Sequence, residues 1–421
     1  QFGDWKTTVQ LALGGAERID LCGYCSMNTI VQMHAANMAM DITDELKEFA
    51  PDALAMMERY IGPYTYDGRI YGLPTYRSYV TNGYLAFNQD ALDELGLTEQ
   101  AADITSWSEL EAVLGSIAEA YSGTGTYPIT PWLGTMVASN KYYIHGDQFS
   151  DIEVVDFLSD TLGVIYTDAE GHVGLSQAQE SYKDACVMAK NWYDRGWIYP
   201  DGLYDSALIN DEVIAGRAAV AEMVTAEVGV ENAKSKIFDA PALCVKFYDG
   251  IVSTNTLTSW GVGVPITAEE PEAACRLINM LYTNEQFLNL FINGEEGVDY
   301  TLTDGQVEQI ENQYKLGQHC LGNAMMLTPL YGNGADYYER VQAENEAAAC
   351  SPYLGFAINT ADMDLVMSQI SAVTDQYKCS IQCGGYTEES YQEYLAKLET
   401  AGVQDYLSAV QAQLDAWLAE K

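Results

Sequence analysis

The sequence predicts an α/β protein built from two lobes, and three observations lead to this fold class. At 421 residues the chain exceeds the length at which a single hydrophobic core stops growing. Helical and extended patterns alternate through the first hundred residues, which is typical of α/β organisation. No repeat or low-complexity stretch marks a linker, so we expect the lobes to be joined by several chain crossings.

The first elements are short and clearly bounded. Residues 5–13 have a helical pattern that ends at two glycines, and residues 19–24 form a short apolar run that predicts a strand. Residues 42–60 predict two helices, with Pro51 in the first turn of the second.

Residues 64–92 combine a hairpin, many aromatic side chains and the start of a helix. Asp67-Gly68 lies between two short β-favouring runs and predicts a type I′ turn, and a second extended run covers residues 78–87. Polar and aromatic side chains gather there: Tyr76, Arg77, Tyr79, Asn82 and Tyr84. Such a mixture suits sugars, whose C–H faces stack on rings while their hydroxyls need directed partners. The alternative is an exposed sheet edge rich in tyrosine.

The middle of the chain is predicted to be mostly helical from residue 129 to residue 257. Before it, Ser106 and Glu109 form a capping box for a helix that continues to about residue 121. Within it we expect a hairpin at residues 164–173, a helix closed by Gly196, and a short strand at residues 218–224.

The last third begins with a strand at residues 259–267. Residues 268–292 predict two helices, separated by a capping box of Thr283 and Gln286. Residues 362–421 are strongly helical in pattern apart from a break at residues 383–387.

Charge excludes one class of partner. Acidic residues outnumber basic residues 61 to 20, and the formal net charge of −41 repels phosphate backbones and anionic lipid surfaces. We therefore expect no nucleic-acid partner. No apolar run approaches the ~20 residues that a membrane span requires.

The nine cysteines do not form a disulfide framework, because they are dispersed and odd in number. Cys22-x-x-Cys25 is compatible with a redox or zinc motif, but the sequence has no second paired ligand set and its four histidines are scattered. We expect neither a metal nor another cofactor.

An enzyme is the weaker alternative. The adjacent pairs Glu269-Glu270 and Glu295-Glu296 could be glycosidase carboxylates. Hydrolysis, however, needs two carboxyl groups roughly 5 to 9.5 Å apart on either side of the bond, which adjacent residues seldom provide. The sequence also lacks a nucleophile elbow, a P-loop and an H-E-x-x-H helix.

Several segments together resemble family 1 extracellular solute-binding proteins. They are "IDLCGYCSMNT", "DGRIYGLPTY", "YLAFNQDALDELGL", "EEPEAACRLINMLYTNEQFLNLFINGEEGVDY" and "SPYLGFAINT…LETAGVQDYLSAVQAQLDAWL". The chain is most similar to the Gram-positive lipoprotein subgroup that serves ABC-type carbohydrate importers. The resemblance implies a maltose-binding-protein-like fold: two lobes of periplasmic-binding-protein type II, an inter-lobe cleft and a helical C-terminal region.

The resemblance also implies an organisation of the chain and its setting. We expect one lobe from residues 1–100 and 259–325, and the other from residues 101–258 and 326–421. A first strand–helix unit of about 30 residues is expected upstream of Gln1. The protein would be monomeric and extracellular, with a lipid anchor upstream, and would deliver a carbohydrate to ABC permease subunits.

The ligand-binding residues implied by the resemblance come from both lobes. They are Tyr24, Ser26, Asn28, Tyr76, Arg77, Asn82, Trp132, Glu222, Thr225, Trp260, Asn323 and Tyr331. An indole ring offers a sugar a large apolar face and one N–H donor, and the forks of Arg77 and Glu222 could each hold two vicinal hydroxyls. The structural alternatives are core tryptophans and salt bridges.

Two departures from the family pattern bear on the ligand. Met27 stands where relatives often carry a tryptophan, and an expected aromatic is missing around His319. An oligosaccharide is the predicted ligand. A peptide, an amino acid or an acidic sugar in the same fold remains the alternative, since Arg77 could bind a carboxylate.

Overall fold

The computed structural model describes residues 18–25, 30–131, 154–203, 219–311, 316–360 and 362–420. The chain divides into two compact units. Unit 1 comprises Gln1–Val80 and Ile251–Asn359, and unit 2 comprises Thr81–Gly250 and Thr360–Lys421. The chain therefore crosses from one unit to the other three times. The helix predicted at residues 5–13 lies outside the described residues.

The unit boundaries differ from the predicted lobe boundaries at residues 100, 258 and 325. Strand β5 (Asn82–Asn88) belongs to unit 2, because it pairs with strands on both of its sides there. Helix α15 (Tyr337–Ala347) belongs to unit 1, where the Asn345 side chain accepts a hydrogen bond from the Tyr79 N–H and donates one to the Arg77 carbonyl. Long-range pairing, which no local pattern records, sets these boundaries.

Unit 1 is organised around a three-stranded antiparallel sheet of order β1-β11-β4. Its strands are β1 (Cys22–Cys25), β11 (Trp260–Gly263) and β4 (Leu73–Pro74). Two buried tyrosines pack directly on glycines of β11: Tyr64 on Gly261 and Tyr24 on Gly263. Glycine at these two positions allows a ring to approach the strand closely.

The hairpin predicted at Asp67-Gly68 is confirmed. Strands β2 (Thr65–Tyr66) and β3 (Arg69–Ile70) pair antiparallel, and both turn residues have positive φ, as a type I′ turn requires. The two helices predicted before it are α3 (Thr43–Phe49) and α4 (Pro51–Met57), with Pro51 opening the second.

The helical pair after β11 is confirmed, but its predicted capping box is wrong. Thr283 is the last residue of α13 (Pro271–Thr283), and α14 (Glu285–Asn293) begins after Asn284. The Asn284 side chain caps α14 by accepting the Phe287 N–H at 2.9 Å. The remaining elements of unit 1 are α2 (Ile30–Ala35), η2 (Glu58–Tyr60), η3 (Gly62–Tyr64), α12 (Thr254–Thr258), β12 (Tyr300–Thr303), β13 (Gln306–Gln309) and η6 (Ala324–Met326).

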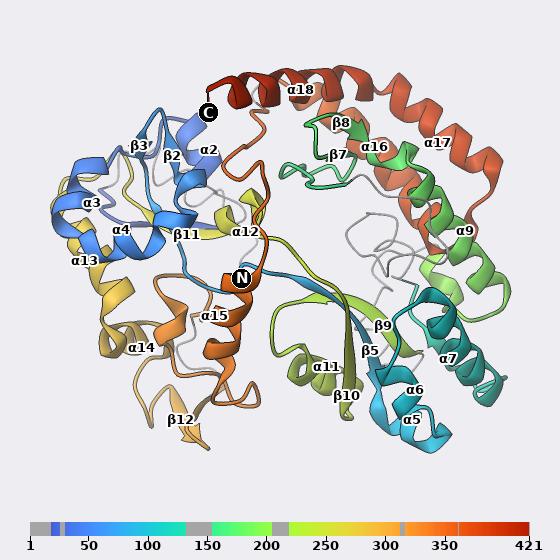
Figure 1. The fold of residues 1–421 in the computed structure, drawn as a ribbon. Helices are drawn as coiled ribbons and strands as arrows, with labels where there is room; N and C mark the ends of the chain where they lie inside the picture. The colour runs from blue at the N-terminus through green and yellow to red at the C-terminus, as the bar shows by residue number, and fades with distance from the viewer. Residues whose placement is uncertain are drawn as a thin grey trace. The chain divides into compact units, whose positions relative to one another are not determined.

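Unit 2 contains a four-stranded sheet of order β10-β5-β9-β6, in which only β6 and β9 run parallel. Besides β5 its strands are β10 (Ala242–Tyr248), β9 (Ala219–Ala226) and β6 (Tyr127–Ile129). Helix α11 (Val230–Phe238) packs on the β5–β10 part of the sheet (Figure 1). Strand β9 is predicted from the sequence, but β10 falls in the region that is predicted to be mostly helical, although "ALCVKFY" is rich in β-favouring residues.

The remaining local predictions in unit 2 are largely confirmed. Helix α7 (Trp107–Ala120) is capped by Ser106, while the Glu109 carboxylate accepts the Thr105 N–H at 2.8 Å. The predicted hairpin is β7 (Ile165–Thr167) and β8 (Val173–Leu175). Helix α9 (Glu180–Asp194) ends before Gly196, whose φ is +72°. The other elements are α5 (Gln89–Leu95), α6 (Thr98–Ala102), η4 (Ser176–Ala178) and η5 (Pro200–Leu203).

The C-terminal region consists of α16 (Asp364–Ser380), a π-helical turn (Ile381–Gly385), α17 (Glu388–Thr400) and α18 (Val403–Glu420). The predicted break therefore falls at the π-helical turn. Within unit 2 these helices pack on one another and on α9 (Figure 1). Hydrogen bonds join them to earlier parts of the unit, among them those of Gln382 to the Tyr182 hydroxyl (2.9 Å), Tyr391 to the Gln177 carbonyl (2.8 Å) and Tyr406 to Asp160 (2.8 Å).

Candidate ligand-binding site

The unit 1 sheet brings three predicted site segments to one edge. Cys25 at the end of β1 pairs with Trp260 at the start of β11. The chain that leaves β4 passes the same point, because the Thr75 N–H donates to the Trp260 carbonyl at 3.0 Å. Arg77 follows two residues later. Antiparallel pairing thus places Trp260 beside the segment that carries Arg77.

His319 contacts Trp260 there and lies close enough to Arg77 for the guanidinium charge to act on its pKa. The Trp260 and His319 ring centroids lie 4.8 Å apart, and the rings are inclined at 71°. Arg77 and Trp260 are half-buried, whereas His319 is exposed. We call Arg77, Trp260 and His319 the Trp260 cluster. It combines an indole ring with an imidazole and a guanidinium group, and so offers an apolar platform beside directed hydrogen-bonding groups.

The electrostatics of the cluster keep its histidine neutral. The surrounding protein weakens the solvation of the His319 imidazolium, and the positive charge of Arg77 repels an added proton. Both effects lower the pKa of His319 below its ordinary value of 6.5. At neutral pH the imidazole therefore has one N–H donor and one acceptor nitrogen.

Three predicted site residues are structural in unit 1 or unit 2. Tyr24 is fully buried, and its hydroxyl donates to the Tyr71 carbonyl at 3.1 Å. The buried Asn323 side chain accepts the Met325 N–H at 3.1 Å and caps η6. The buried Asn82 side chain accepts the Gly250 N–H at 2.9 Å. Packing and internal hydrogen bonds account for these three side chains without a ligand, and their predicted ligand contacts stay predictions.

Glu222 likewise has a partner within its own unit. Its side chain is fully buried on β9, and its carboxylate lies 2.8 Å from the Lys234 ammonium of α11. The structure thus gives Glu222 a buried ion pair within unit 2, and its predicted contact with a ligand stays a prediction. Thr225 on the same strand is half-buried and pairs with Gly83 of β5.

Tyr76 and Tyr331 are two further predicted site residues among those that the structure describes. Tyr76 is half-buried and its ring packs 6.0 Å from the rings of Tyr60 and Tyr79. Tyr331 is 44% exposed, and its N–H donates to the Val307 carbonyl. Ser26, Asn28 and Trp132 lie outside the described residues.

The Cys22-x-x-Cys25 motif has the environment of packed thiols. Both residues are buried in β1, and no disulfide joins them. Burial raises the pKa of Cys22 to about 11. A thiol with a raised pKa is a poor nucleophile at neutral pH.

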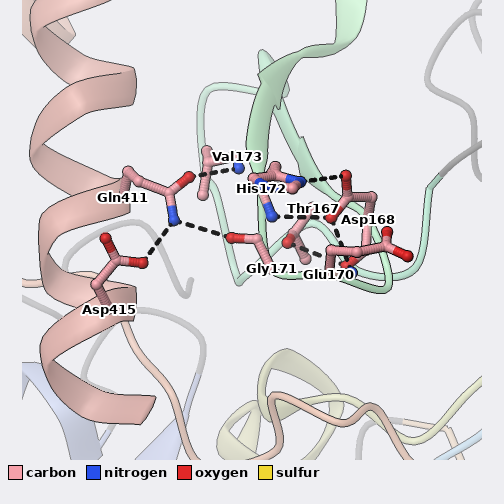
Figure 2. Close-up of polar contacts among 8 residues, drawn as sticks. All are labelled: Thr167, Asp168, Glu170, Gly171, His172, Val173, Gln411 and Asp415. Carbon is pink, nitrogen blue, oxygen red and sulfur yellow. Dashed lines mark hydrogen bonds and ion pairs between the residues drawn. The ribbon is translucent and has the colours of Figure 1, made fainter. Parts of the chain in front are cut away.

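Among the described residues, one cluster has the composition of a metal site. Donor atoms of Asp168, Glu170 and His172 in the β7–β8 hairpin lie within 4.8 Å of one another (Figure 2). The Asp168 carboxylate already accepts the N–H groups of Glu170 and His172, at 3.0 and 2.8 Å, and its other oxygen lies 2.9 Å from His172 Nδ1. These bonds close the hairpin loop and account for the arrangement.

The same hairpin is attached to α18 by one side chain. Gln411 accepts the Val173 N–H at 2.7 Å and donates to the Gly171 carbonyl at 2.9 Å and to Asp415 at 2.8 Å (Figure 2). The amide thereby satisfies backbone groups on both sides of the turn, so the hairpin and the C-terminal helix are positioned together.

Two α/β units joined by three crossings define a two-lobe binding-protein fold. Residues 26–294 match the family described as bacterial extracellular solute-binding protein, and this match covers more than half of the chain. The chain therefore belongs to the bacterial extracellular solute-binding proteins. Residues 352–419 match a domain of unknown function. No helix among the described residues is long and apolar enough to cross a membrane.

Relatives and solved structures agree with this assignment over the full length. A protein named carbohydrate ABC transporter substrate-binding protein, from Streptococcus pneumoniae, is 22% identical over 100% of this chain and 84% of its own. The N-glycan transport solute binding protein (NgtS) of the same species has a TM-score of 0.76 and 20% identity, covering 99% and 90%. An HMO binding ABC-transporter associated solute binding protein of Bifidobacterium longum infantis has a TM-score of 0.65 and 16% identity, covering 99% and 91%. The predicted two-lobe α/β fold is confirmed.

Proposed function

We propose that this protein captures a carbohydrate, in particular an oligosaccharide, and delivers it to an ABC importer. The observation that carries the proposal is the similarity of the entire chain to a carbohydrate ABC transporter substrate-binding protein. NgtS, which has the same fold, has been crystallised with Man1GlcNAc and with Man5GlcNAc. The Trp260 cluster supports a ligand of this class, because an indole ring and directed polar groups suit a sugar's apolar faces and hydroxyls.

The partners and setting follow from the same proposal. The protein would act as an extracellular, monomeric receptor held at the cell surface by a lipid anchor, and ABC permease subunits would be its partners. It would bind its ligand without breaking a bond in it. The relatives are likewise named as substrate-binding and solute binding proteins. Micromolar affinity, about −8 kcal/mol, is sufficient for such a receptor.

A thermal-shift screen tests the ligand class. A ligand present at a hundred times its dissociation constant is expected to add about 2.7 kcal/mol to the free energy of unfolding. Man1GlcNAc, Man5GlcNAc and kestose form the sugar set, and a dipeptide mixture, free amino acids and an acidic monosaccharide form the comparison set. At least one member of the sugar set should raise the melting temperature. A rise with only the comparison set would overturn the proposal.

Trp260→Ala is expected to weaken sugar binding by at least about tenfold, or 1.4 kcal/mol, because the apolar platform of the cluster is removed. Isothermal titration calorimetry measures this effect. The matched control is Trp197→Ala, which removes a half-buried tryptophan of unit 2 that packs on Trp192 and Arg195. Equal affinities of the Trp260 variant and the wild-type protein would exclude Trp260 from the site.

A further inference from the structure

We propose that His319 is a ligand-binding residue of the Trp260 cluster and that its imidazole forms a hydrogen bond with a carbohydrate hydroxyl beside the Trp260 ring. From the sequence, His319 stands out only as a departure from the family pattern and is not among the predicted site residues. The inference rests on the proposed function. The hydrogen bond of His319 would be a polar, titratable contact at a position where an aromatic ring was expected.

The backbone around His319 is firmly anchored by its neighbours. The buried Gln318 side chain donates to Asn293 at 2.9 Å and to the Thr328 carbonyl at 2.8 Å, and accepts the Tyr338 hydroxyl at 2.7 Å. On the other side, the Cys320 carbonyl accepts the Thr75 hydroxyl at 3.1 Å. Because the flanking residues hold the segment in place, the loop does not depend on the exposed His319 ring for its position.

The two rings of the cluster meet at a steep angle. An interplanar angle of 71° is a near-perpendicular contact, which covers less of the Trp260 indole face than a parallel stack would. His319 is exposed, so its ring is accessible from solvent. A sugar ring lying on the indole would therefore bring its hydroxyls to the level of the imidazole.

The charge state of His319 suits a hydroxyl partner. A hydroxyl both donates and accepts hydrogen bonds, and a neutral imidazole does the same through its two nitrogens. Protonation would remove the acceptor nitrogen and place a second positive charge near Arg77, the charged group that acts on this histidine. Among the described residues, the thiol of the neighbouring Cys320 lies close enough to Arg77 and Cys25 for their charges to act on its pKa.

This arrangement predicts a specific pH dependence. The form of His319 that binds the sugar is present above its pKa and is lost below it. Affinity should therefore be constant at neutral pH and above, and should fall by up to about tenfold per pH unit once the pH drops below the His319 pKa. Calorimetric titration with Man1GlcNAc, Man5GlcNAc and kestose between about pH 5 and pH 8, where histidine titrates, measures the profile.

Two substitutions separate hydrogen bonding from ring packing. In His319→Gln an amide donor and acceptor remain but cannot titrate, so we expect affinity within a few-fold of wild type near pH 8 and a flat pH profile. In His319→Phe the ring remains without its nitrogens, so we expect about three- to tenfold weaker binding near pH 8. Thermal unfolding of both variants without ligand checks that they are folded.

His34→Gln is the matched control. His34 also lies in unit 1 and its pKa is also lowered, chiefly by burial, but its ring stacks on Tyr66 at 3.8 Å instead of contacting the Trp260 cluster. This variant should keep the wild-type pH profile. The inference would be overturned if the sugar affinity of His319→Gln fell at low pH as steeply as that of the wild-type protein, or if His319→Phe bound sugar as tightly as the wild-type protein. Either result would leave the proposed function intact. If no sugar of the set binds the wild-type protein, the proposed function fails and the inference fails with it.

Discussion

Lys234→Met is expected to lower the free energy of unfolding by about 3 to 5 kcal/mol, because it leaves the Glu222 carboxylate charged and buried without its cation. The carboxylate is fully enclosed, the Lys234 side chain is 8% exposed, and the two groups are 2.8 Å apart. Removing one partner of such a pair costs far more than the pair contributes in net terms. Denaturation in guanidinium chloride measures the change.

Two controls isolate the cause of that loss. The double variant Lys234→Met, Glu222→Leu removes both charges and should recover most of the lost stability, since apolar groups of similar volume can replace a buried ion pair. Arg276→Met breaks the exposed pair with Glu272, whose members are 58% and 57% exposed, and should cost less than about 1 kcal/mol. Similar losses in Lys234→Met and Arg276→Met would show that burial does not determine the cost.

Gly263→Ala is expected to destabilise unit 1 by about 1 to 3 kcal/mol through overpacking. A Cβ atom at this position would lie 2.2 Å from the Tyr24 hydroxyl oxygen and 2.6 Å from two ring carbons of the same residue. Tyr24 is fully buried and hydrogen-bonded to the Tyr71 carbonyl, so its ring has no free space to enter. Thermal unfolding of the variant and of the wild-type protein measures the effect.

Gly23→Ala is the matched control for this substitution. Gly23 lies on β1, paired with Val262 of β11, and a Cβ there would meet its nearest neighbour, Leu321, at an ordinary 3.6 Å. Its effect should stay within about 0.5 kcal/mol. If the two variants melt at the same temperature, close packing of Tyr24 on the strand is not the reason for glycine at position 263.

Elements with strong local signals could be predicted from the sequence. Asp67-Gly68 accepts positive φ at both turn positions, and Gly196 ends α9, so their positions follow from backbone chemistry alone. The cap of α14 was misplaced by one residue, because Thr283 and Asn284 are both able to cap and only the helix geometry distinguishes them. Strand β10 was missed because its pairing partner β5 lies more than a hundred residues earlier.

The site was harder to predict than the fold. Trp260 and the segment that carries Arg77 lie at one edge of the unit 1 sheet, whereas Tyr24 and Glu222 are fully buried inside their units. Whether a strand residue faces a ligand or a helix depends on the register and on what covers each face, which the sequence alone does not specify. Glu222 faces α11 and therefore meets Lys234. His319 lies in a loop without periodicity, and only its contact with Trp260 indicates a role.

The hydrogen bonds of the C-terminal helices indicate whether a stretch that matches one domain family can also fold on its own. The match to a domain of unknown function starts at residue 352, inside unit 1, where the Gly355 N–H donates to the Thr254 hydroxyl. The rest of the matched stretch is part of unit 2, where Tyr391, Tyr406 and Gln411 form hydrogen bonds with earlier residues of that unit. Removing residues 352–419 would leave residues of both units without their hydrogen-bond partners. The boundary of the family match therefore does not coincide with a folding boundary.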